Sequence, residues 1–155
     1  MSANPRPEIH IAAALPADVD DICDIEGRAF DNPWCREFFD SELRGSGRYN
    51  LVARRHGRVA GYVFAMWFFD EMHVNKIAVD DRERRQGIAL ALMDECLRFA
   101  RANRIKTISL EVRKSNEGAQ DFYRFIGFEP SYTRPRYYPD GEAAVVMVRT
   151  LARSD

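Results

Sequence analysis

Apolar residues along the chain recur with two spacings, one typical of strands and one typical of helices. Alternation of apolar and polar residues predicts strands, and recurrence every three to four residues predicts helices. The expected elements are, in order, a strand at 9–14, helices from 16 to about 29 and from about 36 to 43, a hairpin of strands at 51–53 and 59–69, a strand at 71–79, a helix from 88 to about 102, a strand at 106–112, a helix at 117–126, and closing strands at 128–132 and 143–150.

This order of elements predicts an α/β fold with a mixed, mostly antiparallel sheet and helices on both faces. The strand–helix–strand unit from 74 to 112 should form a right-handed crossover, which makes its two strands a parallel pair within the sheet. No repeat, low-complexity tract or linker interrupts the pattern. At 155 residues, the chain is expected to form a single domain over 1–155.

The junction between the strand at 71–79 and the following helix is the stretch around which the chain is organised. It consists of Arg84, Arg85, Gln86, Gly87, Ile88 and Ala89. A helix start leaves backbone amides unpaired and carries the positive end of the helix dipole, so it favours an anion. Gly87 lets the backbone come close to a bulky anion, and Arg82, Arg84 and Arg85 add positive charge. The alternative is a plain helix start with a solvated basic turn.

Composition narrows the classes of function. The net charge of −1 predicts neither nucleic-acid binding nor membrane binding. The acidic run that comprises Asp18, Asp20, Asp21, Asp24 and Glu26 is expected to be a solvated face. The N-terminus lacks the apolar core of a signal peptide, and no apolar run reaches membrane-spanning length.

The three cysteines have no metal-ligand spacing, so no metal is expected. Cys23 and Cys96 fall within apolar helical patterns and are expected in the core, whereas Cys35 is expected to be partly exposed. Unpaired cysteines suit a reducing, cytoplasmic location.

The junction motif Arg84-x-x-Gly87-x-Ala89 resembles the Q/R-x-x-G-x-G/A signature of the GCN5-related N-acetyltransferases (GNATs). No Walker or Rossmann glycine pattern competes with it. The resemblance implies the GNAT fold, acetyl-coenzyme A as cosubstrate, and a pyrophosphate held by residues 84–89. It also implies that the main chain of Ile77, Ala78 and Val79 pairs with the pantetheine arm. Ala89 stands where many relatives have a second glycine, which the signature allows.

Two segments further along the chain resemble one branch of that family. Residues 110–116, Leu-Glu-Val-Arg-Lys-Ser-Asn, and the later Tyr-x-x-x-Gly-Phe at 123–128 resemble the RimI-type ribosomal-protein alanine N-acetyltransferases. Acetyl transfer requires a base for the amine and an acid for the departing thiolate. The resemblance implies Glu111 as the base, Tyr123 as the acid and Asn116 as a contact for the pantetheine arm. The plain alternatives are a solvent-facing Glu111 and a core Tyr123.

Aromatic residues mark two candidate acceptor-binding segments. The Tyr137–Tyr138 stretch resembles the loop that closes over the N-terminal residues of a peptide substrate, and Asn32-Pro33-Trp34 resembles the matching N-terminal region. Phe30 and Trp34 either line a substrate groove or fill the core. Tyr137 and Tyr138, flanked by arginines, could instead stack on nucleic acid, which the net charge disfavours. His73 either faces the cleft or is a satisfied structural histidine.

The combined prediction is a cytoplasmic N-terminal protein acetyltransferase, with the N-terminal alanine of a small-subunit ribosomal protein as the acceptor implied by resemblance. Transfer would be direct, in a ternary complex, without nucleic-acid or membrane partners, and the enzyme is expected to be a monomer or a weak dimer. One alternative keeps the family but takes a lysine side chain or a small amine as acceptor. Another is an acyl-coenzyme A-binding module without catalysis.

Overall fold

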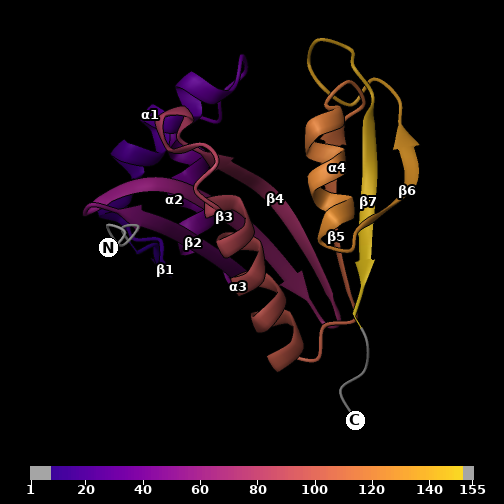
Figure 1. Ribbon diagram of the computed structural model, residues 1–155, viewed down its shortest axis with the longest axis horizontal. Coiled ribbons are helices and arrows are strands. Elements are labelled where there is room, and N and C mark those ends of the chain that lie inside the picture. Colours follow the sequence, from indigo (N-terminus) through magenta and orange to yellow (C-terminus); the bar gives the residue numbers. More distant parts are fainter. Residues whose placement is uncertain (1–7, 152–155) are drawn as a thin grey trace, which may run out of the picture. The chain divides into compact units, whose positions relative to one another are not determined.

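The computed structural model describes residues 8–151, whose elements follow the predicted order (Figure 1). They are β1 (His10–Ala13), the 3-10 helix η1 (Pro16–Asp18), α1 (Val19–Ala29), α2 (Arg36–Arg44), β2 (Arg48–Arg55), β3 (Arg58–Phe68), β4 (Glu71–Val79), the 3-10 helix η2 (Asp81–Glu83), α3 (Ile88–Ala102), β5 (Thr107–Arg113), α4 (Glu117–Phe125), β6 (Glu129–Arg134) and β7 (Ala144–Thr150). The main difference is β2, which extends well beyond the predicted residues 51–53.

The strands form one sheet in the order β1-β2-β3-β4-β5-β7-β6. β4 pairs with β5 in parallel, with Glu71–Val74 opposite Thr107–Leu110. The β1–β2, β5–β7 and β6–β7 pairs are antiparallel. The predicted mixed sheet with one parallel β–α–β pair is therefore confirmed.

The chain divides into two compact units, each with its own buried residues. The first unit comprises the residues up to Phe64 together with Lys76–Leu97. Its core joins α1 and α2 to β2, β3 and the end of β4, and consists of Val19, Ile22, Ile25, Phe39, Val52, Val59, Tyr62, Phe64 and Ala78. This unit contains the predicted phosphate loop.

The second unit comprises Ala65–Asn75 and the chain from Arg98 onward. Along β5, Ile108, Leu110 and Val112 are buried, so the intervening residues, including Glu111, face the other side of the strand. Figure 1 shows α4 lying beside β7. The Asn116 side chain caps α4 by accepting a hydrogen bond from the Ala119 amide at 3.1 Å, as the sequence predicts.

The acidic run is a solvated face only in part. Asp20, Asp21 and Asp24 are exposed, but Asp18 and Glu26 are buried, so the expectation is wrong for these two residues. Helical spacing turns them inward, and each has partners: Asp18 accepts a hydrogen bond from the Leu15 amide at 2.9 Å, and Glu26 binds three donors described below.

The cysteines are free. Cys96 is buried as predicted, and burial raises the pKa of its thiol to about 12. Cys23 is half-buried rather than fully buried, and Cys35 is exposed. Burial also raises the pKa of Cys23. Neither Cys23 nor Cys96 therefore shows the lowered pKa that marks a nucleophilic cysteine.

Candidate active site

The connection from β4 to α3 is an open turn whose backbone can receive an anion. Arg85 and Gly87 adopt left-handed conformations, with φ of 62° and 78°. The Gly87 carbonyl accepts a hydrogen bond from the Ala91 amide at 3.0 Å, so the first amides of α3 have no acceptor within the helix. A Cβ built on Gly87 would meet no heavy atom within 4 Å. The backbone at the start of α3 is therefore open to a phosphate group.

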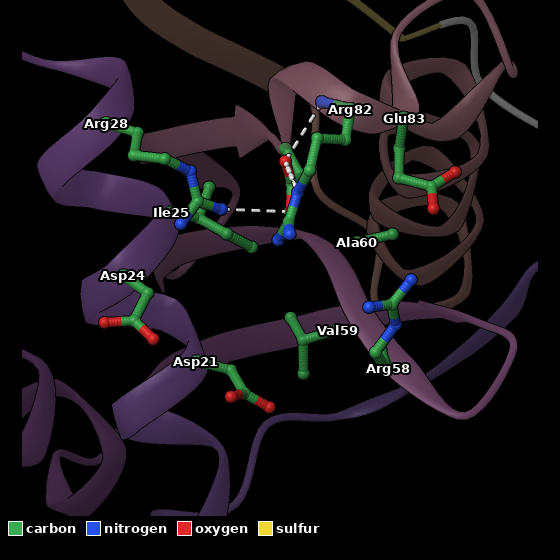
Figure 2. A pocket seen from close by; sticks show the side chains of 10 residues that line it. Asp21, Asp24, Ile25, Arg28, Arg58, Val59, Ala60, Arg82 and Glu83 are labelled. Carbon is green, nitrogen blue, oxygen red and sulfur yellow. Dashed lines mark hydrogen bonds and ion pairs between the residues drawn. The ribbon is translucent and has the colours of Figure 1, made fainter.

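Asp80 anchors this turn. Its carboxylate is 3% exposed and accepts hydrogen bonds from the Arg82 amide at 3.0 Å, from the Arg82 guanidinium at 2.8 Å and from the Arg28 guanidinium at 3.0 Å. Figure 2 shows the two arginines reaching the same point from α1 and η2. These bonds, above all those from Arg82, hold the pKa of Asp80 well below its ordinary value. Because Arg82 is paired here, the positive charge at the mouth of the turn rests on the exposed Arg84 and Arg85.

A small cavity of about 100 Å³ adjoins this anchor in the first unit. Its charged lining residues are Asp21, Asp24, Arg28, Arg58, Asp80, Arg82 and Glu83 (Figure 2). Glu83 is also paired with the buried Arg55. Charges of both signs surround the cavity, and the ion pairs of Glu83 with Arg55 and of Arg82 with Asp80 hold η2 in place.

Close packing by Gly61 fixes the other side of the turn. A Cβ on Gly61 would lie 2.9 Å from the Ala78 carbonyl oxygen and 2.9 Å from the Ile88 side chain. Only glycine therefore lets β3 pack this tightly against the end of β4 and the first residue of α3. Ala78 is buried between the half-buried Ile77 and Val79, the residues predicted to pair with the pantetheine arm.

In the second unit, Glu111 is bound through both carboxylate oxygens. The Oε2 atom lies 2.6 Å from Nε2 of His73, and the Arg134 guanidinium donates to Oε1 at 3.3 Å. The Glu111 side chain is only 11% exposed, so the alternative of an ordinary solvent-facing residue is wrong. His73 also contacts Asn75, with Nδ1 2.6 Å from the Asn75 Oδ1 atom. Both nitrogens of His73 are thus occupied, and one partner is the predicted base.

The contact between His73 and Glu111 shifts the pKa of both side chains. Burial alone would lower the pKa of His73, but the hydrogen bonds to Glu111 and Asn75 outweigh burial and raise it. Burial alone would raise the pKa of Glu111, but the hydrogen bond and charge of His73, together with Arg134, lower it. Both shifts favour the charged forms, an imidazolium for His73 and a carboxylate for Glu111.

Tyr123 occupies a buried position on α4. Its side chain contacts two aromatic neighbours, with ring centroids 5.2 Å from Phe122 and 5.8 Å from Phe128. The core position is confirmed, and it holds the ring in one orientation. The role of Tyr123 as an acid stays a prediction. The side-chain Oδ1 atom of Asn116 accepts the capping hydrogen bond from Ala119. The side-chain Nδ2 atom is therefore the group left to meet a pantetheine arm.

Two arginines at the ends of β5 and β6 hold the loop between β6 and β7. The guanidinium of Arg113 lies 4.1 Å from the Tyr138 ring centroid, and that of Arg134 lies 4.8 Å from the Tyr137 ring centroid. Arg113 also donates to Asp140 at 2.8 Å and to Glu142 at 2.9 Å. Burial raises the pKa of Tyr138 to about 12, so its hydroxyl stays protonated. One face of each tyrosine ring is therefore already covered, and the loop is ordered.

Phe30 and Trp34 lie in the first unit, and each has features of both predicted alternatives, a core residue and a residue that lines a groove. They are half-buried and pack against the core, yet each keeps part of its surface exposed. The Lys76 ammonium lies 3.7 Å from the Phe30 ring centroid and 4.9 Å from the Trp34 ring centroid. The two rings therefore form a wall with a cation behind it.

The chain matches the Acetyltransferase (GNAT) family over residues 19–128. The chain belongs to the GNAT acetyltransferase family. It is similar to the [ribosomal protein bS18]-alanine N-acetyltransferase of Escherichia coli K12, at 33% identity over 131 residues that cover 83% of this chain and 88% of the relative. A crystal structure of the ribosomal-protein-S18-alanine N-acetyltransferase from Escherichia coli superposes with a TM-score of 0.88 at 30% identity, covering 96% of this chain and 97% of that one.

A second relative is longer. The uncharacterized protein ML0378 of Mycobacterium leprae is 38% identical over 151 residues, which cover 94% of this chain but 41% of that protein. The chain thus spans about two fifths of that relative. Family membership and the RimI-type relationship rest on the matches that cover most of both chains.

GNAT enzymes use acetyl-coenzyme A, and the turn before α3 fits its pyrophosphate. The left-handed Gly87, the open space at its Cβ position and the unpaired helix amides together make a cradle for an anion. Within residues 8–151, no cluster of three or more His, Cys, Asp or Glu side chains is arranged to hold a metal ion. Among the described helices, none is both long and apolar enough to cross a membrane.

Sequence reasoning missed several groups that hold candidate site residues in place within each unit. Arg134 and Asn75 lie far from Glu111 in the sequence, and no spacing rule connects them to it. Asp80 reads as part of an acidic turn, although its place directly after a strand is a weak signal for an anchor. Glu26 gave the clearest signal, because it falls on the apolar stripe of α1 beside Ile25.

Proposed function

We propose that this GNAT enzyme is an Nα-acetyltransferase that transfers the acetyl group of acetyl-coenzyme A directly to protein N-termini. The proposed acceptor is the N-terminal alanine of a small-subunit ribosomal protein, which the name of the Escherichia coli relative supports. The observation that carries the proposal is the mostly buried Glu111 carboxylate, held by His73 and Arg134. It lies in the same unit as the Tyr137–Tyr138 loop.

Glu111 is proposed to take the proton from the acceptor ammonium, directly or through one water. Its two fixed oxygens limit the directions from which a donor can approach, which orients the acceptor. A carboxylate with a lowered pKa is a weak base, so its pairing with His73 matters. When His73 loses its proton, the part of the lowering that comes from its charge is relieved while that from Arg134 stays, and Glu111 becomes a somewhat stronger base.

Tyr123 is proposed to hold the proton that the departing thiolate takes up. Its phenol suits this role, since a tyrosine stays protonated near neutral pH and can donate as charge develops on sulfur. The ring packs against Phe122 and Phe128, which restricts the positions that its hydroxyl can take. Acetyl-coenzyme A supplies the thioester that makes the acetyl group transferable.

Cofactor binding is proposed to use the main chain of Ile77, Ala78 and Val79 for the pantetheine arm and the turn from Arg84 to Ala89 for the pyrophosphate. The amides of Gln86, Gly87, Ile88 and Ala89 would donate to phosphate oxygens, and the exposed Arg84 and Arg85 would add charge. Asn116 would meet the arm through its amide nitrogen.

Acceptor binding is proposed to use Tyr137 and Tyr138 from the β6–β7 loop, and Phe30 and Trp34 from the α1–α2 connection. The ordered tyrosine loop supports a peptide acceptor, because a preorganised loop loses little conformational entropy when a flexible N-terminus binds. Two functions compete with this proposal. One is a GNAT enzyme that acetylates a lysine side chain or a small-molecule amine, and the other is a non-catalytic module that binds acyl-coenzyme A.

Acetylation of an array of peptides tests the proposal. The peptides begin with Ala, Ser, Thr or Met, each beside an Nα-blocked copy that carries an internal lysine, with free amines as further acceptors. Turnover of the unblocked peptides, with alanine preferred, supports the proposal. Turnover of only the blocked lysine peptides or the free amines would reject it, and cofactor binding without any turnover would favour the non-catalytic module.

A further inference from the structure

We propose that Glu26 and Lys76 are positioning residues that hold the acceptor-binding wall formed by Phe30 and Trp34. The proposed mechanism assigns neither residue to proton transfer or cofactor binding. The inference rests on the proposed function, which assigns the acceptor to that wall. All four residues lie in the first unit.

Glu26 is the hub of this arrangement. Its side chain is fully buried and receives three donors. Oε1 accepts from the Tyr62 hydroxyl at 2.6 Å, and Oε2 accepts from the Trp34 amide at 2.8 Å and from the Lys76 ammonium at 2.9 Å. The carboxylate therefore ties the backbone at Trp34 to β3 and β4 at one point.

Lys76 completes the arrangement from the other side. Its side chain is 13% exposed, and its ammonium contacts the faces of both wall residues while pairing with Glu26. A cation attracts the negative face of an aromatic ring, and it does so more strongly when it is shielded from water. One ammonium group thus sets where the Phe30 and Trp34 rings stand relative to each other.

The connection that carries the wall needs such an anchor. Residues between Phe30 and Cys35 form no helix or strand. Trp34 also packs against Phe38 and Phe39, at ring-centroid distances of 4.5 and 5.4 Å. These apolar contacts hold the indole, but they leave the backbone of the connection unconstrained. The bond from the Trp34 amide to Glu26 supplies that constraint.

A buried ion pair is seldom retained for stability alone. The cost of removing both charges from water offsets most of their attraction, and apolar residues of the same volume would stabilise the fold as well or better. A carboxylate that accepts three directional bonds does fix the relative positions of its three donors. The location of the pair behind two half-exposed rings indicates that the geometry serves the wall.

The test compares Lys76→Met, Lys76→Arg and the double variant Glu26→Gln/Lys76→Met with wild type. Lys106→Met, at a lysine whose side chain is 61% exposed, is the matched control. Steady-state kinetics give the KM for an alanine peptide and the KM for acetyl-coenzyme A, and thermal unfolding shows that each variant is folded. The double variant leaves no unpaired buried charge, so it keeps the test open if a single variant unfolds.

We expect Lys76→Met and the double variant to raise the KM for the peptide by about three- to thirtyfold, while the KM for acetyl-coenzyme A stays unchanged. Lys76→Arg keeps a cation over the rings and should recover part of the loss. A folded double variant with a wild-type KM for the peptide would overturn the inference. So would equal changes in both KM values.

A second readout does not depend on the acceptor. Trp34 and Trp67 are the two tryptophans of the chain, so Trp67→Phe leaves Trp34 as its fluorescent reporter. In that background, Lys76→Met should increase quenching of Trp34 by acrylamide, and unchanged quenching would overturn the positioning role. If wild type acetylates no peptide, the proposed function fails, whereas the quenching result still decides the inference.

Discussion

The Nε2 atom of His73 and the Oε2 atom of Glu111 lie 2.6 Å apart, on two parallel strands of the second unit. A histidine on β4 therefore helps to lower the pKa of Glu111, the residue that the family resemblance indicates as the base. The pairing shifts the pKa of each residue and so changes how the site depends on pH.

Replacing His73 by Gln should lower the free energy of unfolding most at pH values between the lowered pKa of Glu111 and the raised pKa of His73. The pKa of His73 is raised from 6.5, so its contribution is fully present below 6.5 and is lost as pH rises through the raised value. The pKa of Glu111 is lowered from 4.5, so its contribution is present above 4.5 and is lost as pH falls through the lowered value. Denaturant unfolding should show a loss of about 1 kcal/mol near pH 5–6 that disappears at high pH. A loss that is independent of pH would contradict the pairing.

Glu111→Gln and Tyr123→Phe should each lower kcat by about 10²–10⁴-fold, the typical range for a general base or acid. Both changes preserve shape, so acetyl-coenzyme A should still bind with near wild-type affinity. Glu129→Gln and Tyr132→Phe, at exposed positions of β6, are the matched controls and should keep full activity. Steady-state kinetics with an alanine peptide provide the measurement, and full activity in either test variant removes that residue from the proposed mechanism.

Gly87→Ala should weaken acetyl-coenzyme A binding. Alanine at a φ of 78° is strained, and its methyl group would stand in the space left open for the pyrophosphate. We expect the Kd from calorimetry to rise about tenfold or more, and stability to fall by about 1 kcal/mol. Gly27→Ala is the control: Gly27 lies inside α1 with open space around it, so alanine should stabilise the helix by up to about 1 kcal/mol. Equal effects at both glycines would argue against a special role for Gly87.

Arg113→Lys should loosen the β6–β7 loop without removing the positive charge. Lysine cannot reproduce the flat contact of the guanidinium with the Tyr138 ring, nor its simultaneous bonds to Asp140 and Glu142. The KM for a peptide acceptor should rise by about three- to tenfold, while binding of acetyl-coenzyme A stays the same. Kinetics measured with each substrate varied in turn will separate the effect on the peptide from the effect on acetyl-coenzyme A. An effect on the cofactor alone would mean that the loop does not serve the acceptor.

The order of elements could be predicted because each element carries a local signal. Each of these signals depends on residues that are close together in the sequence. Examples are the apolar stripe of α3, the alternation along β5 and the Asn116 cap. The GNAT motif at residues 84–89 lies on one such junction. The fold and the position of the phosphate loop therefore follow from local patterns.

The surroundings of the candidate site could not be predicted in the same way. Whether Glu111 faces solvent or a partner depends on His73 and Arg134, which the fold brings together from 38 and 23 residues away. The place of Glu26 on the apolar stripe of α1 indicates burial, but no spacing in the sequence indicates its partners Trp34, Tyr62 and Lys76. Long-range pairing of charged side chains leaves no periodic trace in a sequence.

Helix α1 links the proposed acceptor wall to the proposed phosphate turn within the first unit. Glu26 in this helix holds the aromatic wall, and Arg28, only two residues later, grips the Asp80 carboxylate that anchors the phosphate turn. A small rotation of one helical segment would therefore move both regions together. Any coupling through this segment is reciprocal in binding free energy, so the cofactor and the peptide would change each other's equilibrium affinity by the same factor.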